Sequence, residues 1–240
     1  MVVRRRVEFQ AAYLLHSYPW RETSLIAEIF SPDHGRVAMV AKGARRPLSN
    51  LRSVLMAFQP LSLTWSGKAE VKTLVEAEWV GGLPLLQGSA LLCGYYLNEL
   101  LLRLLPREDP HPRLFEAYAQ SLAKLALGLP HAPLLREFEL TLLRELGYAP
   151  TLDREADGQR PVIPSEYYFF LPERGPVPAR GESADSALIP GHVLLAMAAG
   201  DFSQPATLSH AKALMRRLIN HHLDGQELAS RRILIELQEL

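Results

Sequence analysis

Hydrophobic and polar positions alternate in short runs through the first 80 residues, which is the pattern of half-buried β-strands. Turn-forming residues separate the runs, and aromatic and β-branched residues are frequent inside them. The predicted strands cover residues 9–16, 23–30, 36–42, 58–65 and 70–79. Five short strands favour a closed barrel, because closure removes exposed strand edges, and the OB-fold is the commonest five-stranded barrel.

The pattern changes after Gly81 and Gly82, where leucines begin to recur at helical spacing. The predicted helices cover residues 89–105, 112–127, 133–146, 192–199, 205–223 and 230–240. Residues 148–190 are rich in proline and are predicted to form an irregular excursion, with strand character at 167–171 and one hairpin. We therefore predict a multidomain α+β protein, with an OB-fold domain at 1–80 and a mainly helical domain at 81–240.

Composition excludes several classes of protein. The longest apolar stretch, 83–105, is broken by Gln87, Asn98, Glu99 and Arg103, so it lacks the uninterrupted run of roughly 20 apolar residues that a membrane span needs. No signal peptide is recognisable, which predicts a cytoplasmic protein. Cys93 is the only cysteine, so neither an internal disulfide nor a multi-cysteine zinc site is expected.

Charge is balanced over the chain but not along it. Lys and Arg number 26, as do Asp and Glu, yet residues 1–60 contain nine cations and four anions. The strongest local cluster follows the third predicted strand and contains Lys42, Arg45, Arg46 and Arg52. Cations in a loop beside a barrel suit a phosphate backbone, although a run of like charges is as often a solvated loop.

Other residues of the barrel region extend this prediction. Arg36, Lys68 and Lys72 are candidates to lengthen a basic track, or are solubilising residues that face outward. Among the aromatic residues, Trp20 is expected to be exposed in a turn, while the others are expected in the core.

Enzymatic chemistry has little support in the sequence. It contains no Gly-rich phosphate loop, no G-x-S-x-G motif and no H-E-x-x-H pair. A nuclease that holds a metal with Asp33, His34 or Glu70 is improbable, because no clustered set of carboxylates accompanies them. An OB-fold RNA-binding factor of ribosome assembly or translation stays open, because backbone electrostatics do not choose between nucleic acids.

Two segments resemble the RecO family of recombination mediators. They are residues 12–25, which contain Ser17-Tyr18-Pro19-Trp20-Arg21, and residues 34–45, which end in Lys42-Gly43-Ala44-Arg45. Shorter matches follow at 58–61, 67–74, 96–101 and 136–140. The resemblance covers the whole chain and is weakest between 150 and 190. It implies an OB-fold followed by a helical domain, without enzymatic activity.

The resemblance also implies partners. It suggests binding of single- and double-stranded DNA, strand annealing, docking on the acidic C-terminal tail of single-strand-binding protein, and loading of RecA together with RecR. It places the protein in the cytoplasm, associated with the nucleoid. No cofactor is implied. Many family members carry a four-cysteine zinc site, but residues 148–190 contain no cysteine, so no zinc is expected.

Individual residues take roles by the same resemblance. Lys42, Arg45 and Arg46 would contact the DNA backbone, and Arg136 would grip the acidic tail. Glu137 stands where close relatives often have a second arginine, which weakens attraction for an acidic tail. Arg103 and Arg113 are candidates to compensate.

Overall fold

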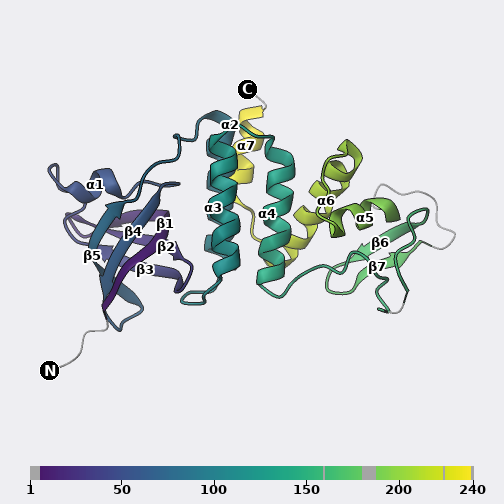
Figure 1. The fold of residues 1–240 in the computed structure, drawn as a ribbon, viewed down its shortest axis with the longest axis horizontal. Coiled ribbons are helices and arrows are strands. Elements are labelled where there is room, and N and C mark those ends of the chain that lie inside the picture. Colours follow the sequence, from purple (N-terminus) through teal and green to yellow (C-terminus); the bar gives the residue numbers. More distant parts are fainter. Residues whose placement is uncertain (1–5, 159, 180–187, 224, 239–240) are drawn as a thin grey trace. The chain divides into compact units, whose positions relative to one another are not determined.

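The structure is a computed structural model and describes residues 6–158, 160–179, 188–223 and 225–238, with side chains described up to 233. The chain forms two compact units. The first contains residues 1–129 together with 228–240, and the second contains residues 130–227. The change from strands to helices falls near residue 80 (Figure 1). Because the first unit extends to residue 129, it contains helices as well as the strands. The functional division at residue 80 stays a prediction.

The first five strands close into a barrel, which confirms the predicted fold class. They pair in the order β1-β2-β3-β5-β4, and β4 returns to β1. All pairs are antiparallel except β3 and β5. The strands are β1 (Arg6–Trp20), β2 (Ser24–Ser31), β3 (Gly35–Ala41), β4 (Pro60–Ser66) and β5 (Val71–Trp79).

Alternation along the strands builds the barrel core. Ala27 and Ile29 of β2 face inward with Val37 and Met39 of β3, and Trp65 of β4 joins the same cluster. Strand β1 serves both neighbours because its first half pairs with β4 and its second half with β2. A bulge at Leu15, within the half that pairs with β2, changes the set of β1 residues that face outward.

A short helix, α1 (Asn50–Val54), follows β3 and was not predicted (Figure 1). It has only five residues, so its partly buried Leu51 and Val54 are too few to reveal a helical period in the sequence.

Three longer helices belong to the first unit: α2 (Gly88–Leu104), α3 (Pro112–Ala126) and α7 (Ala229–Gln238). Helices α2 and α3 lie side by side (Figure 1). Tyr13 and Phe30, on the outer face of the barrel, make ring contacts with Phe115 and Tyr118 of α3. This contact attaches the helices to the barrel through aromatic side chains, of which Tyr13, Phe30 and Tyr118 are buried and Phe115 is partly buried.

Helix α7 is fixed by a residue far away in sequence. The Glu99 carboxylate of α2 accepts hydrogen bonds from the backbone amides of Ala229 and Ser230, at 2.9 and 2.8 Å. It also accepts one from the Ser230 hydroxyl at 2.6 Å. A carboxylate at the first turn of a helix satisfies amides that have no partner within the helix.

The second unit contains α4 (His131–Glu145), α5 (Gly191–Ala198) and α6 (Pro205–His222). A three-stranded sheet in the order β7-β6-β8 accompanies them, formed by β6 (Tyr167–Leu171), β7 (Gly175–Pro178) and β8 (Ile189–Pro190). Their common core includes Leu143, Tyr168, Val193, Met197 and Leu214. The strand expected at 167–171 is confirmed, and residues 180–187 of the predicted excursion lie outside the described residues.

Candidate nucleic-acid interface

The basic loop, which we define as residues 42–52, leaves β3 and passes beside the β1–β2 turn. The backbone amide of Arg45 donates to the Thr23 carbonyl oxygen at 2.9 Å. The Arg45 guanidinium donates through Nη1 to the carbonyl oxygens of Glu22 and Arg21, at 3.2 and 3.4 Å. The loop and the turn are therefore joined along an edge of the barrel.

The loop is anchored by apolar residues although its tip is charged. Ala44 is buried in the barrel core, and Leu51 and Leu55 pack against the same core. Between them lies a hollow of about 340 Å³, lined by Leu25, Ala44, Arg45, Leu51, Arg52 and Leu55. Gly43 has a φ of +70°, a conformation that favours glycine and lets the chain turn at the start of the loop.

The four loop cations are directed to solvent. Lys42, Arg45, Arg46 and Arg52 are all exposed. Within the described part of the chain, none of them forms an ion pair with a carboxylate. Their charge is therefore available to an external anion, and the bonds from Arg45 to two carbonyl oxygens leave its positive charge uncompensated.

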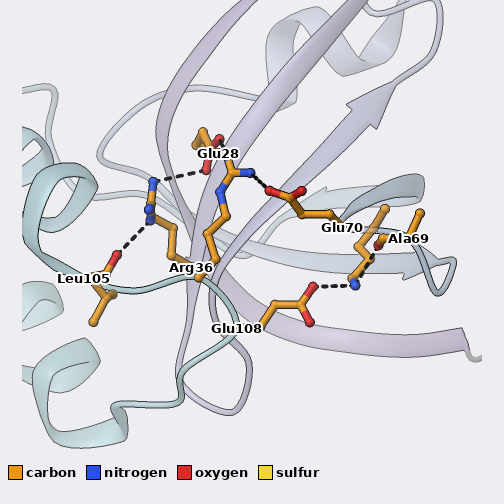
Figure 2. Close-up of polar contacts among 8 residues, drawn as sticks. Glu28, Arg36, Ala69, Glu70, Leu105 and Glu108 are labelled. Atoms are coloured by element: carbon orange, nitrogen blue, oxygen red, sulfur yellow. Dashed lines mark hydrogen bonds and ion pairs between the residues drawn. The ribbon is translucent and has the colours of Figure 1, made fainter.

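Arg36 and Lys72, also predicted as DNA-binding residues, are engaged inside the protein. Figure 2 shows Arg36 directed toward Glu28 and Leu105. Arg36 donates through Nε to the Leu105 carbonyl oxygen at 3.1 Å, and its Nη1 lies 3.7 Å from Glu28. Burial lowers the pKa of Arg36, an effect that the Glu28 charge opposes. The Lys72 ammonium, only 12% exposed, lies 2.5 Å from Glu108 and 2.9 Å from the Ala69 carbonyl oxygen.

Arg107 completes this ion-pair network, and sequence reasoning missed it. Its guanidinium contacts Glu28 at 2.5 Å and also pairs with Glu70. The segment that carries it lies along β3: the Glu108 amide donates to the Arg36 carbonyl oxygen at 3.0 Å. The sequence around 106–109 has no periodicity, so only the folded chain brings these residues to the barrel.

Glycine is required where this segment approaches the β2–β3 turn. Gly35 has a φ of +62°, and a Cβ placed on it would lie 2.0 Å from the Asp109 carbonyl oxygen. The positive φ by itself favours glycine in this turn. The close approach of residue 109 is a second and stronger requirement.

The remaining predicted site residues are dispersed. Lys68 is exposed in the β4–β5 turn. Arg103 and Arg113 are both exposed and belong to the first unit. Arg136 belongs to the second unit, is 8% exposed, and places its Nη2 atom 2.6 Å from Glu139. The structure therefore does not gather the three tail-binding candidates in one unit.

The residues considered for metal chemistry do not converge. The His34 ring makes an edge-on contact with Trp65, with ring centroids 5.1 Å apart, and Glu70 is paired with Arg107. Over the described residues, no three His, Cys, Asp or Glu side chains form a possible metal site. In the same residues, no helix has the length and apolar character needed to cross a bilayer.

Exposure of the aromatic residues follows the prediction in part. Tyr13, Phe58 and Trp65 are buried and Trp20 is exposed, as expected, although Trp20 is the last residue of β1 and not part of a turn. Tyr18, expected in the core, is 39% exposed. The error arises from the bulge at Leu15, whose effect on strand parity is not visible in the sequence.

A closed five-stranded barrel with an unpaired basic loop and attached helices defines the class of OB-fold proteins suited to nucleic-acid backbones. Known families agree with this class. Residues 7–83 match the family model described as Recombination protein O N terminal, and residues 85–232 match Recombination protein O C terminal.

Individual relatives extend over the whole chain. A DNA repair protein RecO of Aromatoleum aromaticum is 62% identical over 240 residues, which cover the full length of both chains. A protein of the same name from Azoarcus sp. is 57% identical over 243 residues, again at full coverage. One from Dechloromonas aromatica is 53% identical. The chain belongs to the RecO family.

Proposed function

We propose that this protein is a recombination mediator in DNA repair that binds single- and double-stranded DNA without sequence preference. The observation that carries the proposal is the basic loop, whose four cations are exposed and lack carboxylate partners in the described structure. Family membership favours DNA over RNA as the ligand. Lys68 extends the surface, because the β1–β2 and β4–β5 loops of OB-folds flank bound strands.

Electrostatic binding of this kind predicts a steep dependence on salt. Each phosphate neutralised on a single strand contributes a slope of about −0.7 to the logarithm of affinity against the logarithm of salt. Four contacts give a slope of about −2.8. Raising salt from about 50 to about 200 mM then weakens binding roughly 50-fold.

The test is fluorescence anisotropy of a labelled single-stranded DNA oligonucleotide at these two salt concentrations. The Arg45→Glu/Arg46→Glu variant removes two of the four contacts, so its salt effect is expected to fall to about sevenfold or less, with much weaker binding. A matched control is Lys212→Glu/Arg216→Glu, which makes the same charge change at exposed positions of α6 in the second unit. Equal losses in both variants, or none in the loop variant, would contradict the proposed site.

The proposal extends to the partners of the family: strand annealing, docking on the acidic tail of single-strand-binding protein, and loading of RecA with RecR. No catalytic step is proposed.

For the tail, Arg113 and Arg103 are the better placed residues, because Arg136 is buried against Glu139 and reaches an outside carboxylate only if that pair opens. Arg36 and Lys72 are omitted from the DNA surface because their cations are already paired.

Docking is tested with a labelled acidic peptide that ends in the tail sequence. Arg113→Glu is expected to lower peptide affinity, while Lys212→Glu, a cation reversal in the second unit, leaves it unchanged. If Arg136→Met removed peptide binding in a folded protein and Arg113→Glu did not, the tail site would lie in the second unit instead.

A further inference from the structure

The outer face of β1 carries a row of rings that the barrel core does not use. The row consists of His16, Tyr18 and Trp20, and all three side chains are exposed. Tyr18 is 39% and Trp20 42% exposed. What distinguishes these rings is that they stand at alternate positions of one strand and so form a continuous row on one face. The row is therefore a candidate contact surface.

Strand register fixes the direction of these side chains. Residues directly opposite each other in an antiparallel pair share a face of the sheet. Ser17 lies opposite Ala27 and Pro19 opposite Leu25, and Ala27 and Leu25 pack in the barrel core. The bulge at Leu15 thus turns the alternate residues, from His16 to Trp20, away from the barrel interior.

The same outer face differs along its length. At Tyr13 and Phe30 it is covered by Phe115 and Tyr118 of α3 and is buried. From His16 onward it is open. The His16 and Tyr18 rings have centroids 6.2 Å apart and planes inclined by 30°, which suits flat ligands that follow one another along the strand.

The row ends where the basic loop is attached. Trp20 precedes the β1–β2 turn, and the Arg45 guanidinium is bonded to the carbonyl oxygens of Arg21 and Glu22 in that turn. Flat rings beside cations that track a backbone are the combination found where proteins hold single strands. Positive charge at the end of the row also favours a polyanion over an apolar protein partner.

We propose that Tyr18 and Trp20, with His16, stack unpaired bases of a single strand whose phosphates lie on the basic loop. The proposal rests on the proposed DNA binding and adds a preference for single strands over duplex. Bases in a duplex are already stacked, so duplex DNA uses the loop alone and gains nothing from the row.

The test compares two single-stranded oligonucleotides of equal length and charge, one of thymidine and one abasic. Wild type is expected to bind the thymidine strand more tightly, and either Tyr18→Ala or Trp20→Ala to lose about tenfold of that affinity. Binding of the abasic strand and of duplex DNA, and the salt slope, stay as in wild type. Trp20→Phe retains a ring and is expected to keep most of the preference.

Tyr167→Ala is the matched control, because Tyr167 is a tyrosine of the second unit that is 52% exposed. Melting curves establish that each variant folds. If wild type binds both strands equally and with steep salt dependence, the row has no role and the proposed function stands. If wild type binds neither strand, the proposed function itself fails. If the alanine variants lower the affinity for the abasic strand and for the thymidine strand equally, the row supports the basic loop and does not contact bases.

Discussion

The basic loop and the ion-pair network at Glu28 both contain arginine and lysine, but these cations have different functions in the two regions. In the loop, Arg45, Arg46 and Arg52 are exposed and lack carboxylate partners within the described structure. In the network, Arg36, Lys72 and Arg107 surround Glu28, Glu70 and Glu108 (Figure 2). A cation is thus available to a ligand only where the folded chain brings no carboxylate near it, and otherwise it stabilises the structure.

Burial explains why the network belongs to the structure. Glu28 is 5% exposed, and a buried carboxylate is tolerated only with charged or hydrogen-bonding partners. Its two guanidinium partners come from β3 and from the segment at 106–109, so the ion pairs attach that segment to the barrel. Pairs at the solvent-exposed edge of the network contribute less than those at Glu28.

The largest expected effect is at Gly35. Replacing it with alanine is expected to cost about 3 kcal/mol or more of unfolding free energy, because the new Cβ would meet the backbone of Asp109 and the φ is positive. Gly43→Ala in the basic loop is the matched control. Its φ is also positive, but the nearest atom to its Cβ would be 3.6 Å away, so about 1 kcal/mol is expected. Denaturant unfolding of both variants decides whether the difference exists.

Glu28→Gln addresses the network itself. It removes the charge between two guanidinium groups and is expected to lower unfolding free energy by about 2 to 3 kcal/mol while leaving DNA affinity unchanged. Glu76→Gln is the same substitution at an exposed position of β5 and is expected to stay within about 0.5 kcal/mol. Equal stability of the two variants would show that the network contributes nothing to folding.

Glu99 shows a third use of charge, in which a carboxylate receives backbone amides. Desolvation raises its pKa, but hydrogen bonds from Ser230 and Ala229 and the charge of Arg103 outweigh this, so the pKa lies below its usual value. The carboxylate therefore stabilises the fold above its unfolded pKa, near 4.3, and this contribution disappears as pH falls through the folded value.

Glu99→Gln is accordingly expected to cost about 1 kcal/mol at pH 7 and progressively less at about pH 3. Unfolding of wild type and variant at both pH values measures the gap between them. Glu78→Gln, at an exposed position, serves as control. A gap that widened in acid would mean that the carboxylate does not favour its charged form in the folded protein.

The smallest effect on stability is expected for the loop cations. Arg52→Ala is predicted to change unfolding free energy by less than about 0.5 kcal/mol, yet to reduce the salt slope for single strands by about 0.7. Lys72→Ala removes the same charge from the network and is expected to do the reverse, with lower stability and an unchanged slope. If Lys72→Ala flattened the slope instead, the division between loop and network would be wrong.

Much of the architecture follows from local patterns. Strands β2 to β5 lie within two residues of their predicted bounds, but β1 begins three residues before and ends four residues after the predicted 9–16. The longer helices begin and end within two residues of the predicted bounds wherever the structure describes them. Helix α1 escaped prediction because five residues are too short a window to reveal a helical period. The roles of Arg36 and Lys72 were not predictable either, since their partners Leu105 and Glu108 lie 69 and 36 positions away in sequence.

The class of fold, the basic loop after β3 and the likeness to the RecO family could be read from the chain alone, because each depends on residues close together in it. The folded structure was needed to learn which cations stay available, which aromatic rings face outward and how Glu99 holds helix α7. These depend on strand register, on one bulge and on contacts across up to 131 residues. Whether a charge is paired and whether a ring is exposed depend on the surroundings of the side chain, and only the folded chain supplies those surroundings.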